Sequence, residues 1–228
     1  MVVYGDVNST LAAALVAAKL HTPVAHVEAG LRSFDNTMPE EINRRVTDSL
    51  SALHLVTSPE AIGHLAREGI AAAGIHFVGN PMIDTLLGNI ERFDVSRARD
   101  AVGLDGAGAY GLVTLHRPAN VDDPDAIAAL VVALKEITGE LPLVFPVHPR
   151  GRAAFERAGL MTIRGLSVVD PLGYVEFVSL MRGAALVVTD SGGVQEETTV
   201  LRVPCVTVRP NTERPVTISH CTNRLSGI

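Results

Sequence analysis

Two acidic residues follow the first two apolar runs of the sequence, in positions suited to acid–base chemistry. Asp6 follows the run 2–5, and Glu28 follows the run 23–27. If these runs form neighbouring parallel strands, which lie about 4.8 Å apart, the two carboxylates share one site. Two carboxylates in one site oppose each other's ionisation, so one of them can hold a proton for general acid–base catalysis. The alternative is that Asp6 caps a helix and Glu28 is a solvated loop residue.

A Ser-Gly-Gly turn between a predicted strand and a predicted helix is typical of an anion-binding site. Ser191, Gly192 and Gly193 stand at this junction, where free backbone N–H groups and the helix dipole would make a phosphate cradle. The pattern is neither a Walker loop nor GxGxxG, so it does not predict ATP or NAD binding. Glu197, one helical turn further on, could reach a ribose diol. The alternative is that the glycines only make a tight turn.

His116 and Arg117 follow another apolar run, 111–115. An imidazole beside a guanidinium at a strand end suits a diphosphate. The alternative is that His116 is held in place by a structural hydrogen bond, and the same alternative applies to His26 and His148.

All of these residues lie where predicted strands end, and the segments between them indicate an α/β fold. Short β-rich runs alternate with Ala- and Leu-rich amphipathic segments, the pattern of βαβ units around a parallel sheet. Ligands of such sheets bind outside the carboxyl ends of the strands. The predicted strands are 2–5, 23–27, 53–57, 75–78, 112–115, 142–147, 166–169, 185–189 and 204–208, and the predicted helices include 9–20, 40–50, 61–69, 124–138, 175–182 and 194–201.

The interval between the two sets of strands marks the predicted domain boundary. Residues 81–101 are predicted to form one long helical stretch, and a Gly/Ala-rich loop at 103–111 follows it. A chain of 228 residues is long enough for one large domain or two modest ones.

Composition narrows the class of protein. A hydrophobic share of 47% with 19% charged residues predicts a packed core and excludes intrinsic disorder. The net charge of -6 argues against nucleic-acid or anionic-membrane partners, and no apolar run approaches the ~18 residues of a membrane span. Two cysteines, neither in a metal-binding spacing, predict no metal site and fit a reducing cytoplasm. No signal peptide precedes the first run, and the abrupt ends suggest a fragment.

Several motifs resemble one enzyme family, and their matches run in order along essentially the whole chain. They resemble the non-hydrolysing UDP-N-acetylglucosamine 2-epimerases. The matching segments are Gly5-Asp6-Val7-Asn8-Ser9-Thr10, 23–33, Met38-Pro39-Glu40-Glu41-Ile42-Asn43-Arg44, Gly79-Asn80, His116-Arg117, 189–197 and Arg209 with 211–215.

The resemblance implies a glycosyltransferase-B type fold, in which two Rossmann-like domains form an active site between them. Residues 1–81 would be the carboxyl-terminal part of an incomplete first domain, and 82–228 a second, UDP-binding domain without its final helices. The resemblance also implies a homodimer, no cofactor, and a role in cell-envelope polysaccharide biosynthesis.

The implied reaction interconverts UDP-GlcNAc and UDP-ManNAc by eliminating UDP to a bound 2-acetamidoglucal and adding it back with inversion at C2. Such chemistry needs carboxylates on both faces of C2 and a stabilised leaving group. By motif, the catalytic residues implied are Asp6, Glu28, Glu40 and His116. The substrate-binding residues implied are Arg117, Phe177 against uracil, Ser191, Gly192, Gly193, Glu197 and Arg214.

The sequence departs from the family at its ends and at one internal position. Family chains are longer, and the Gly-Thr-Arg-Pro-Glu loop of their first strand is not present, so we expect this chain alone to be inactive. Cys221 stands where the family has glycine. The alternatives are a glycosyltransferase of the same fold and a noncatalytic UDP-sugar-binding fragment. Paired carboxylates with Glu40 favour the epimerase, because a transferase needs no base directed at C2.

Overall fold

The computed structural model describes residues 1–104 and 108–227 and divides into two compact units, Met1–Asp84 and Thr85–Ile228. This division and the boundary predicted after residue 81 both fall in helix α4, Pro81–Gly88. The middle of the predicted loop 103–111 lies outside the described residues.

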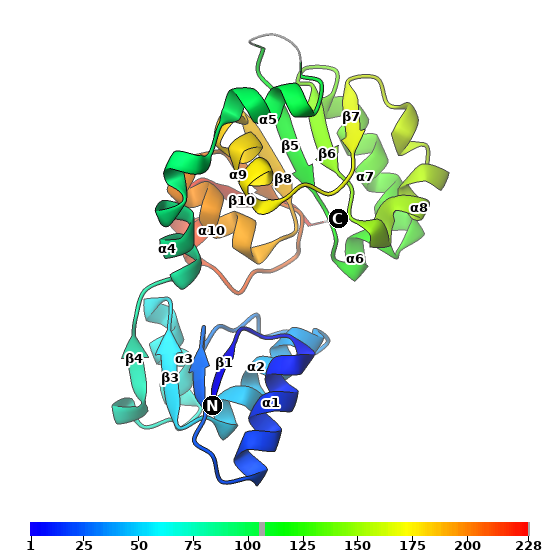
Figure 1. The fold of residues 1–228 in the computed structure, drawn as a ribbon. Helices are drawn as coiled ribbons and strands as arrows, with labels where there is room; N and C mark the ends of the chain where they lie inside the picture. The colour runs from blue at the N-terminus through cyan, green and yellow to red at the C-terminus, as the bar shows by residue number, and fades with distance from the viewer. Residues whose placement is uncertain (105–107, 228) are drawn as a thin grey trace. The chain divides into compact units, whose positions relative to one another are not determined.

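The first unit is a parallel sheet of four strands in the order β1-β2-β3-β4 (Figure 1). All four strands were predicted, and each connection between them contains an α-helix. The strands are β1 Val2–Tyr4, β2 Ala25–Val27, β3 Leu53–Val56 and β4 Ile75–Phe77, and the helices are α1 Asn8–Lys19, α2 Pro39–Leu50 and α3 Pro59–Arg67. Proline at the first position of α2 and of α3 favours helix initiation there, because its missing N–H would be unpaired in any case.

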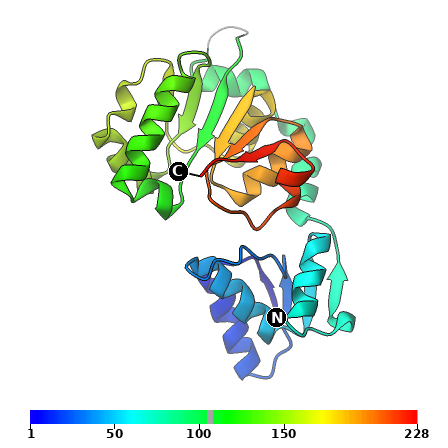
Figure 2. The same cartoon turned by 180° about the vertical axis from the view of Figure 1, so that it is seen from behind.

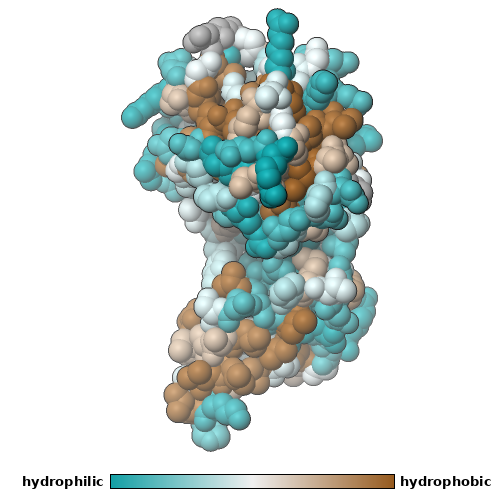
Figure 3. Space-filling model, turned by 90° about the vertical axis from the view of Figure 1, so that its right-hand side faces the viewer, coloured by the Kyte–Doolittle hydropathy of each residue, from teal (hydrophilic) through white to brown (hydrophobic). Residues whose placement is uncertain are grey.

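Small apolar residues pack the first unit. One cluster joins Ala14 and Ala17 of α1 to Val3 and Val24, and a second joins Ala61 and Leu65 of α3 to Ala29 and Val56. The opposite side of α1 is also apolar, and it is the broad hydrophobic surface on this unit in Figure 3. Its exposed side chains are Leu15, Val16 and Leu20.

The second unit is a parallel sheet of six strands in the order β10-β9-β8-β5-β6-β7. Its strands are β5 Gly111–Thr114, β6 Leu143–Pro146, β7 Leu166–Val169, β8 Leu186–Thr189, β9 Cys205–Thr207 and β10 Asn223–Leu225. Five of these were predicted. The missed strand, β10, has only three residues and no apolar alternation, and it is placed by pairing with β9, where Asn223 lies opposite Cys205.

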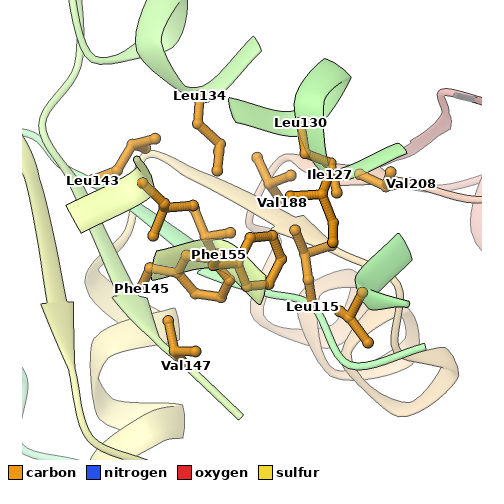
Figure 4. Packing of buried hydrophobic residues seen from close by; sticks show 13 residues of the cluster. Leu115, Ile127, Leu130, Leu134, Leu143, Phe145, Val147, Phe155, Val188 and Val208 are labelled. Carbon is orange, nitrogen blue, oxygen red and sulfur yellow. The ribbon is translucent and has the colours of Figure 1, made fainter. Parts of the chain in front are cut away.

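Helices cover both faces of this sheet (Figures 1 and 2). On one face, α6 Pro118–Val121, α7 Pro124–Ile137 and α8 Pro149–Arg157 enclose an apolar core (Figure 4). Phe145 and Phe155 meet edge to face there, with ring centroids 5.5 Å apart. On the other face lie α9 Tyr174–Gly183 and α10 Gly192–Leu201, which carry predicted site residues.

The helical stretch predicted for 81–101 is not continuous: the structure has α4 and then α5, Val95–Ala101, separated by a 3₁₀ turn at Ile90–Arg92. The cause is a local stop and start signal. Gly88 is the last residue of α4, and the carboxylate of Asp94 accepts a hydrogen bond from the backbone N–H of Arg97 at 3.0 Å, which caps a new helix.

Candidate functional site

The carboxyl edge of the first sheet brings Asp6 and Glu28 to neighbouring strand ends. Tyr4 pairs with Val27, and the N–H of Gly5 donates to the carbonyl of Val27 at 3.1 Å. A Cβ atom on Gly5 would lie 3.4 Å from Oε2 of Glu28, so the Glu28 carboxylate extends over this glycine.

Asp6 is held by helix α2. Its carboxylate pairs with the buried guanidinium of Arg44 at 2.5 Å and keeps 30% of its surface exposed. Asn43, also on α2, donates from its side-chain amide to the carbonyl of Asp6 at 2.8 Å. The residue that caps α1 is Val7, without a side-chain hydrogen bond, so Asp6 does not cap that helix. Asp6 is therefore a positioned carboxylate with one side accessible to a ligand.

Glu28 has a strained backbone. Its φ of 72° lies in the left-handed region, which costs a non-glycine residue about 1–2 kcal/mol. The N–H groups of Glu28 and Ala29 both donate to the carbonyl of Leu55, at 3.0 and 3.3 Å, which holds the loop in this conformation. Such strained residues cluster at functional sites.

The two adjacent glutamates of α2 have different surroundings. Glu41 is buried and accepts hydrogen bonds from the backbone of Ser33 at 2.9 Å and from Arg44 at 3.0 Å, so its carboxylate is used within the fold. Glu40 is half-buried in the first turn of α2. Of this pair, Glu40 is the one with solvent access for chemistry.

In the second unit, Asp190 organises the ends of two paired strands. Thr114 of β5 lies opposite Thr189 of β8, so His116 and Asp190 emerge side by side. The buried carboxylate of Asp190 lies 3.0 Å from Nδ1 of His116 and accepts the backbone N–H of Arg117 at 2.9 Å.

Asp190 also sets the state of His116. Burial alone would raise the pKa of Asp190, but hydrogen bonds and charge from His116, with further donors at Arg117 and Asn120, hold that pKa below its usual range. An ionised carboxylate at Nδ1 places the ring proton there and leaves Nε2 as the free nitrogen. The His116 side chain is 42% exposed, so Nε2 is available to a ligand.

The predicted cradle is the amino-terminal end of α10. Ser191 is its N-cap residue, and its hydroxyl accepts from the N–H of Val194 at 3.5 Å. A Cβ atom on Gly192 would lie 2.6 Å from Oε1 of Glu213 and 3.0 Å from Nη1 of Arg214. A side chain at position 192 would therefore displace the ends of Glu213 and Arg214.

Three guanidinium groups surround Glu213 beside this helix end. Its carboxylate lies 2.7 Å from Arg209, 3.0 Å from Arg214 and 3.9 Å from Arg117. Glu196 of α10 also pairs with Arg214, at 2.6 Å. The concentration of positive charge at a helix amino terminus suits a phosphate or diphosphate.

The remaining predicted contacts come from α9 and α10. Glu197 is buried and accepts a hydrogen bond from the hydroxyl of Tyr174 at 3.0 Å. Burial raises the pKa of Glu197, and burial together with the Glu197 charge raises the pKa of Tyr174 to about 12. Phe177, one turn after Tyr174 on α9, is half-buried.

Asp190 and Glu213 were not predicted as site residues. Asp190 follows the predicted strand 185–189. Its place at a strand end was the signal in the sequence that could have identified it as a site residue. Glu213 lies inside the matching segment 211–215, but its contacts with Arg117 and Arg209 depend on how this loop folds back.

A family model described as UDP-N-acetylglucosamine 2-epimerase matches residues 1–228, the whole chain. The chain belongs to this epimerase family. A relative from Pseudomonas aeruginosa, named UDP-2,3-diacetamido-2,3-dideoxy-D-glucuronate 2-epimerase, is 46% identical over all of this chain and 63% of its own length. The UDP-N-acetylglucosamine 2-epimerase of Methanocaldococcus jannaschii is 43% identical over all of this chain and 64% of its own length.

Solved epimerase structures have the same fold. The Methanocaldococcus jannaschii epimerase in complex with UDP-GlcNAc and UDP aligns with 99% of this chain and 64% of its own, with 41% identity and a TM-score of 0.89. The Neisseria meningitidis epimerase bound to UDP-GlcNAc aligns with 99% of this chain and 63% of its own, with 30% identity and a TM-score of 0.91. The predicted class, α/β with Rossmann-like units of the glycosyltransferase-B type, is confirmed.

Within residues 1–104 and 108–227, no helix is both long and apolar enough to cross a bilayer. Within the same residues, no group of three His, Cys, Asp or Glu side chains is placed to hold a metal ion.

Proposed function

We propose that this protein, at the length of its relatives, interconverts UDP-GlcNAc and UDP-ManNAc. The observation that carries the proposal is the pair of carboxylates, Asp6 and Glu28, on neighbouring strand ends of one sheet. A glycosyltransferase of the same fold needs no base at C2, so this pair favours the epimerase. The family membership of the whole chain and the relatives named for this reaction support the same activity.

In this proposal, residues 1–81 supply acid–base groups and 82–228 bind UDP. The turn Ser191–Gly193 takes the diphosphate, with Arg117 and Arg214 neutralising its charge. Glu197 contacts the ribose and Phe177 packs against uracil.

The chemistry then proceeds in two halves without a redox change. A carboxylate among Asp6, Glu28 and Glu40 removes the C2 proton, and the C1–O bond breaks to release UDP, leaving 2-acetamidoglucal. His116, positioned by Asp190 at Nδ1, donates a hydrogen bond from Nε2 to the departing diphosphate when that nitrogen also carries a proton. A carboxylate on the opposite face then protonates C2, and a UDP oxygen re-forms the bond to C1.

Solvent deuterium tests this mechanism. In heavy water, we expect one deuterium at C2 of the UDP-ManNAc formed, because the returning proton comes from an exchangeable carboxyl group. NMR of the product measures it, and a reaction without enzyme is the control. Product with hydrogen retained at C2 would exclude the mechanism. Transfer of the sugar to an acceptor would identify the transferase alternative, and UDP binding without turnover the noncatalytic one.

Gly192→Ala is expected to weaken UDP binding about tenfold, the effect of disturbing one charge-assisted contact. The new methyl group meets Glu213 and Arg214, so it displaces the Arg214 guanidinium. These are flexible side-chain ends, and the fold is expected to survive.

Titration calorimetry with UDP measures this change. Gly88→Ala is the matched control, because a Cβ atom there meets nothing within 4 Å. Equal UDP affinity of the two variants would place the diphosphate away from Gly192.

One observation favours a second sugar. The 46% identical relative is named for UDP-2,3-diacetamido-2,3-dideoxy-D-glucuronate. Comparing kcat/KM for this compound and for UDP-GlcNAc decides between them, since both reactions invert C2.

The homodimer implied by the family resemblance and the cytoplasmic location indicated by the cysteine content stay predictions. Light scattering on the purified protein measures the first, and fractionation of the source cells the second.

A further inference from the structure

Asp48 is a buried carboxylate on α2 that the proposed reaction does not use. It is fully enclosed, and both of its oxygens are engaged. Oδ1 lies 2.6 Å from Nδ1 of His26, and Oδ2 accepts from the N–H of Gly30 at 3.1 Å and from Arg32 at 2.7 Å.

These contacts reach both loops that carry the strand-end carboxylates. Nε2 of His26 lies 2.9 Å from the carbonyl of Gly5, the residue before Asp6. Gly30, held by Oδ2, is two residues after Glu28. One carboxylate on α2 is therefore connected to the loop after β1 through an imidazole and to the loop after β2 directly.

We propose that Asp48 is a positioning residue. Together with a doubly protonated His26, it holds Asp6 and Glu28 at fixed positions relative to each other. The inference rests on the proposed epimerase function, for which the relative placement of these two carboxylates matters. Neither Asp48 nor His26 is assigned a contact with substrate.

The protonation of His26 follows from its hydrogen-bond partners. The carbonyl of Gly5 only accepts, and an ionised Asp48 only accepts, so both ring nitrogens must donate. Burial alone would raise the pKa of Asp48, but His26 and Arg32 hold it below its usual range, so this carboxylate is ionised.

The charged groups around His26 are of both signs. Asp48 is negative, and Arg32, which also pairs with Glu68, is positive. His54, opposite His26 on β3, lies with its Nε2 2.8 Å from the backbone carbonyl of Asp48 and its Nδ1 3.3 Å from that of Gly74.

The stability of the fold does not require these particular polar contacts. A buried ion pair stabilises a fold little better than well-packed apolar residues of the same volume. What an apolar replacement cannot do is fix a backbone carbonyl and a backbone N–H in two different loops. Arg32 also keeps two contacts to Glu68, at 2.8 and 2.6 Å, so it stays paired when Asp48 loses its charge.

Asp48→Asn tests the proposal, with Asp84→Asn on the exposed surface of α4 as matched control. We expect kcat to fall about tenfold, because small misplacements of reacting groups slow the chemical step. KM and UDP affinity are expected to stay within about twofold, since UDP is assigned to the second unit and positioning acts on the chemical step. A variant that is only partly folded would show an apparent kcat lowered in proportion to its unfolded fraction, with KM unchanged, and circular dichroism measures that fraction.

Imidazole ¹⁵N NMR provides a readout that needs no turnover. In the unchanged protein, His26 is expected to show two N–H signals at neutral pH, and in Asp48→Asn only one. The backbone amides of Asp6 and Gly30 are expected to shift together in that variant.

The outcomes separate the two proposals. A single His26 N–H signal in the unchanged protein, or an unaltered kcat in folded Asp48→Asn, overturns the positioning role. If a version of the protein extended to the length of its relatives epimerises neither sugar, the proposed function fails, and the NMR measurements still decide whether Asp48 holds the two loops.

Discussion

Glu28→Gln is expected to lower kcat for epimerisation at least about 100-fold, the lower end of what a general acid or base contributes. The amide keeps the size of the side chain but cannot accept the C2 proton. Because its carboxylate extends over Gly5 toward the end of β1, Glu28 is placed beside Asp6. The same loss is expected for Asp6→Asn and for Glu40→Gln.

Steady-state kinetics and circular dichroism together check this expectation. Glu91→Gln, an exposed change in the second unit, is the control for the loss of one charge. Arg44 keeps its contact with Glu41 at 3.0 Å when Asp6 becomes asparagine, so the fold of that variant is expected to survive. Near-normal kcat in Glu28→Gln would remove Glu28 from the catalytic group.

Gly30→Ala is expected to destabilise the first unit by about 3 kcal/mol, through two separate costs. The residue has a φ of 79°, in the left-handed region that alanine disfavours. In addition, its new methyl group would lie 2.8 Å from the backbone carbonyl of Ala61 and 3.0 Å from Leu65, where α3 crosses the loop. A backbone atom cannot move aside as a flexible side chain can.

Gly69→Ala is the matched control, because it separates the two costs. Gly69 has a similar φ of 86°, but a Cβ atom there meets nothing within 4 Å. Only the conformational cost applies, and we expect about 1 kcal/mol. Urea unfolding of both variants measures the difference. If the two variants were equally destabilised, the close approach of α3 to Gly30 would contribute nothing to the loss of unfolding free energy.

Local patterns in the sequence determined the fold class and placed most of the candidate site residues at strand ends. The apolar runs that end at Asp6, Glu28 and His116 are strands because β-rich segments of that length alternate with amphipathic helices. Parallel strands place their carboxyl ends on one edge of the sheet, so these polar residues could be assigned to a site without coordinates. The motifs also identified the family, since each is a short continuous segment.

The sequence predicted the helices and strands less well where their local signals are weak. The break between α4 and α5 depends on Gly88 and on the cap at Asp94, which a generally helical composition obscures. Strand β10 has almost no apolar signal of its own and forms because β9 offers it a partner.

Only the tertiary structure decided what each polar side chain does. Asp190 positions His116 because β5 and β8, some seventy residues apart, are neighbours in the sheet. Asp48 connects two loops from a helix that follows both, and its role has no counterpart in any continuous motif. The physical reason is that secondary structure follows from interactions between residues close in sequence. Hydrogen-bond partners and ionisation states instead depend on groups that meet only after the chain has folded.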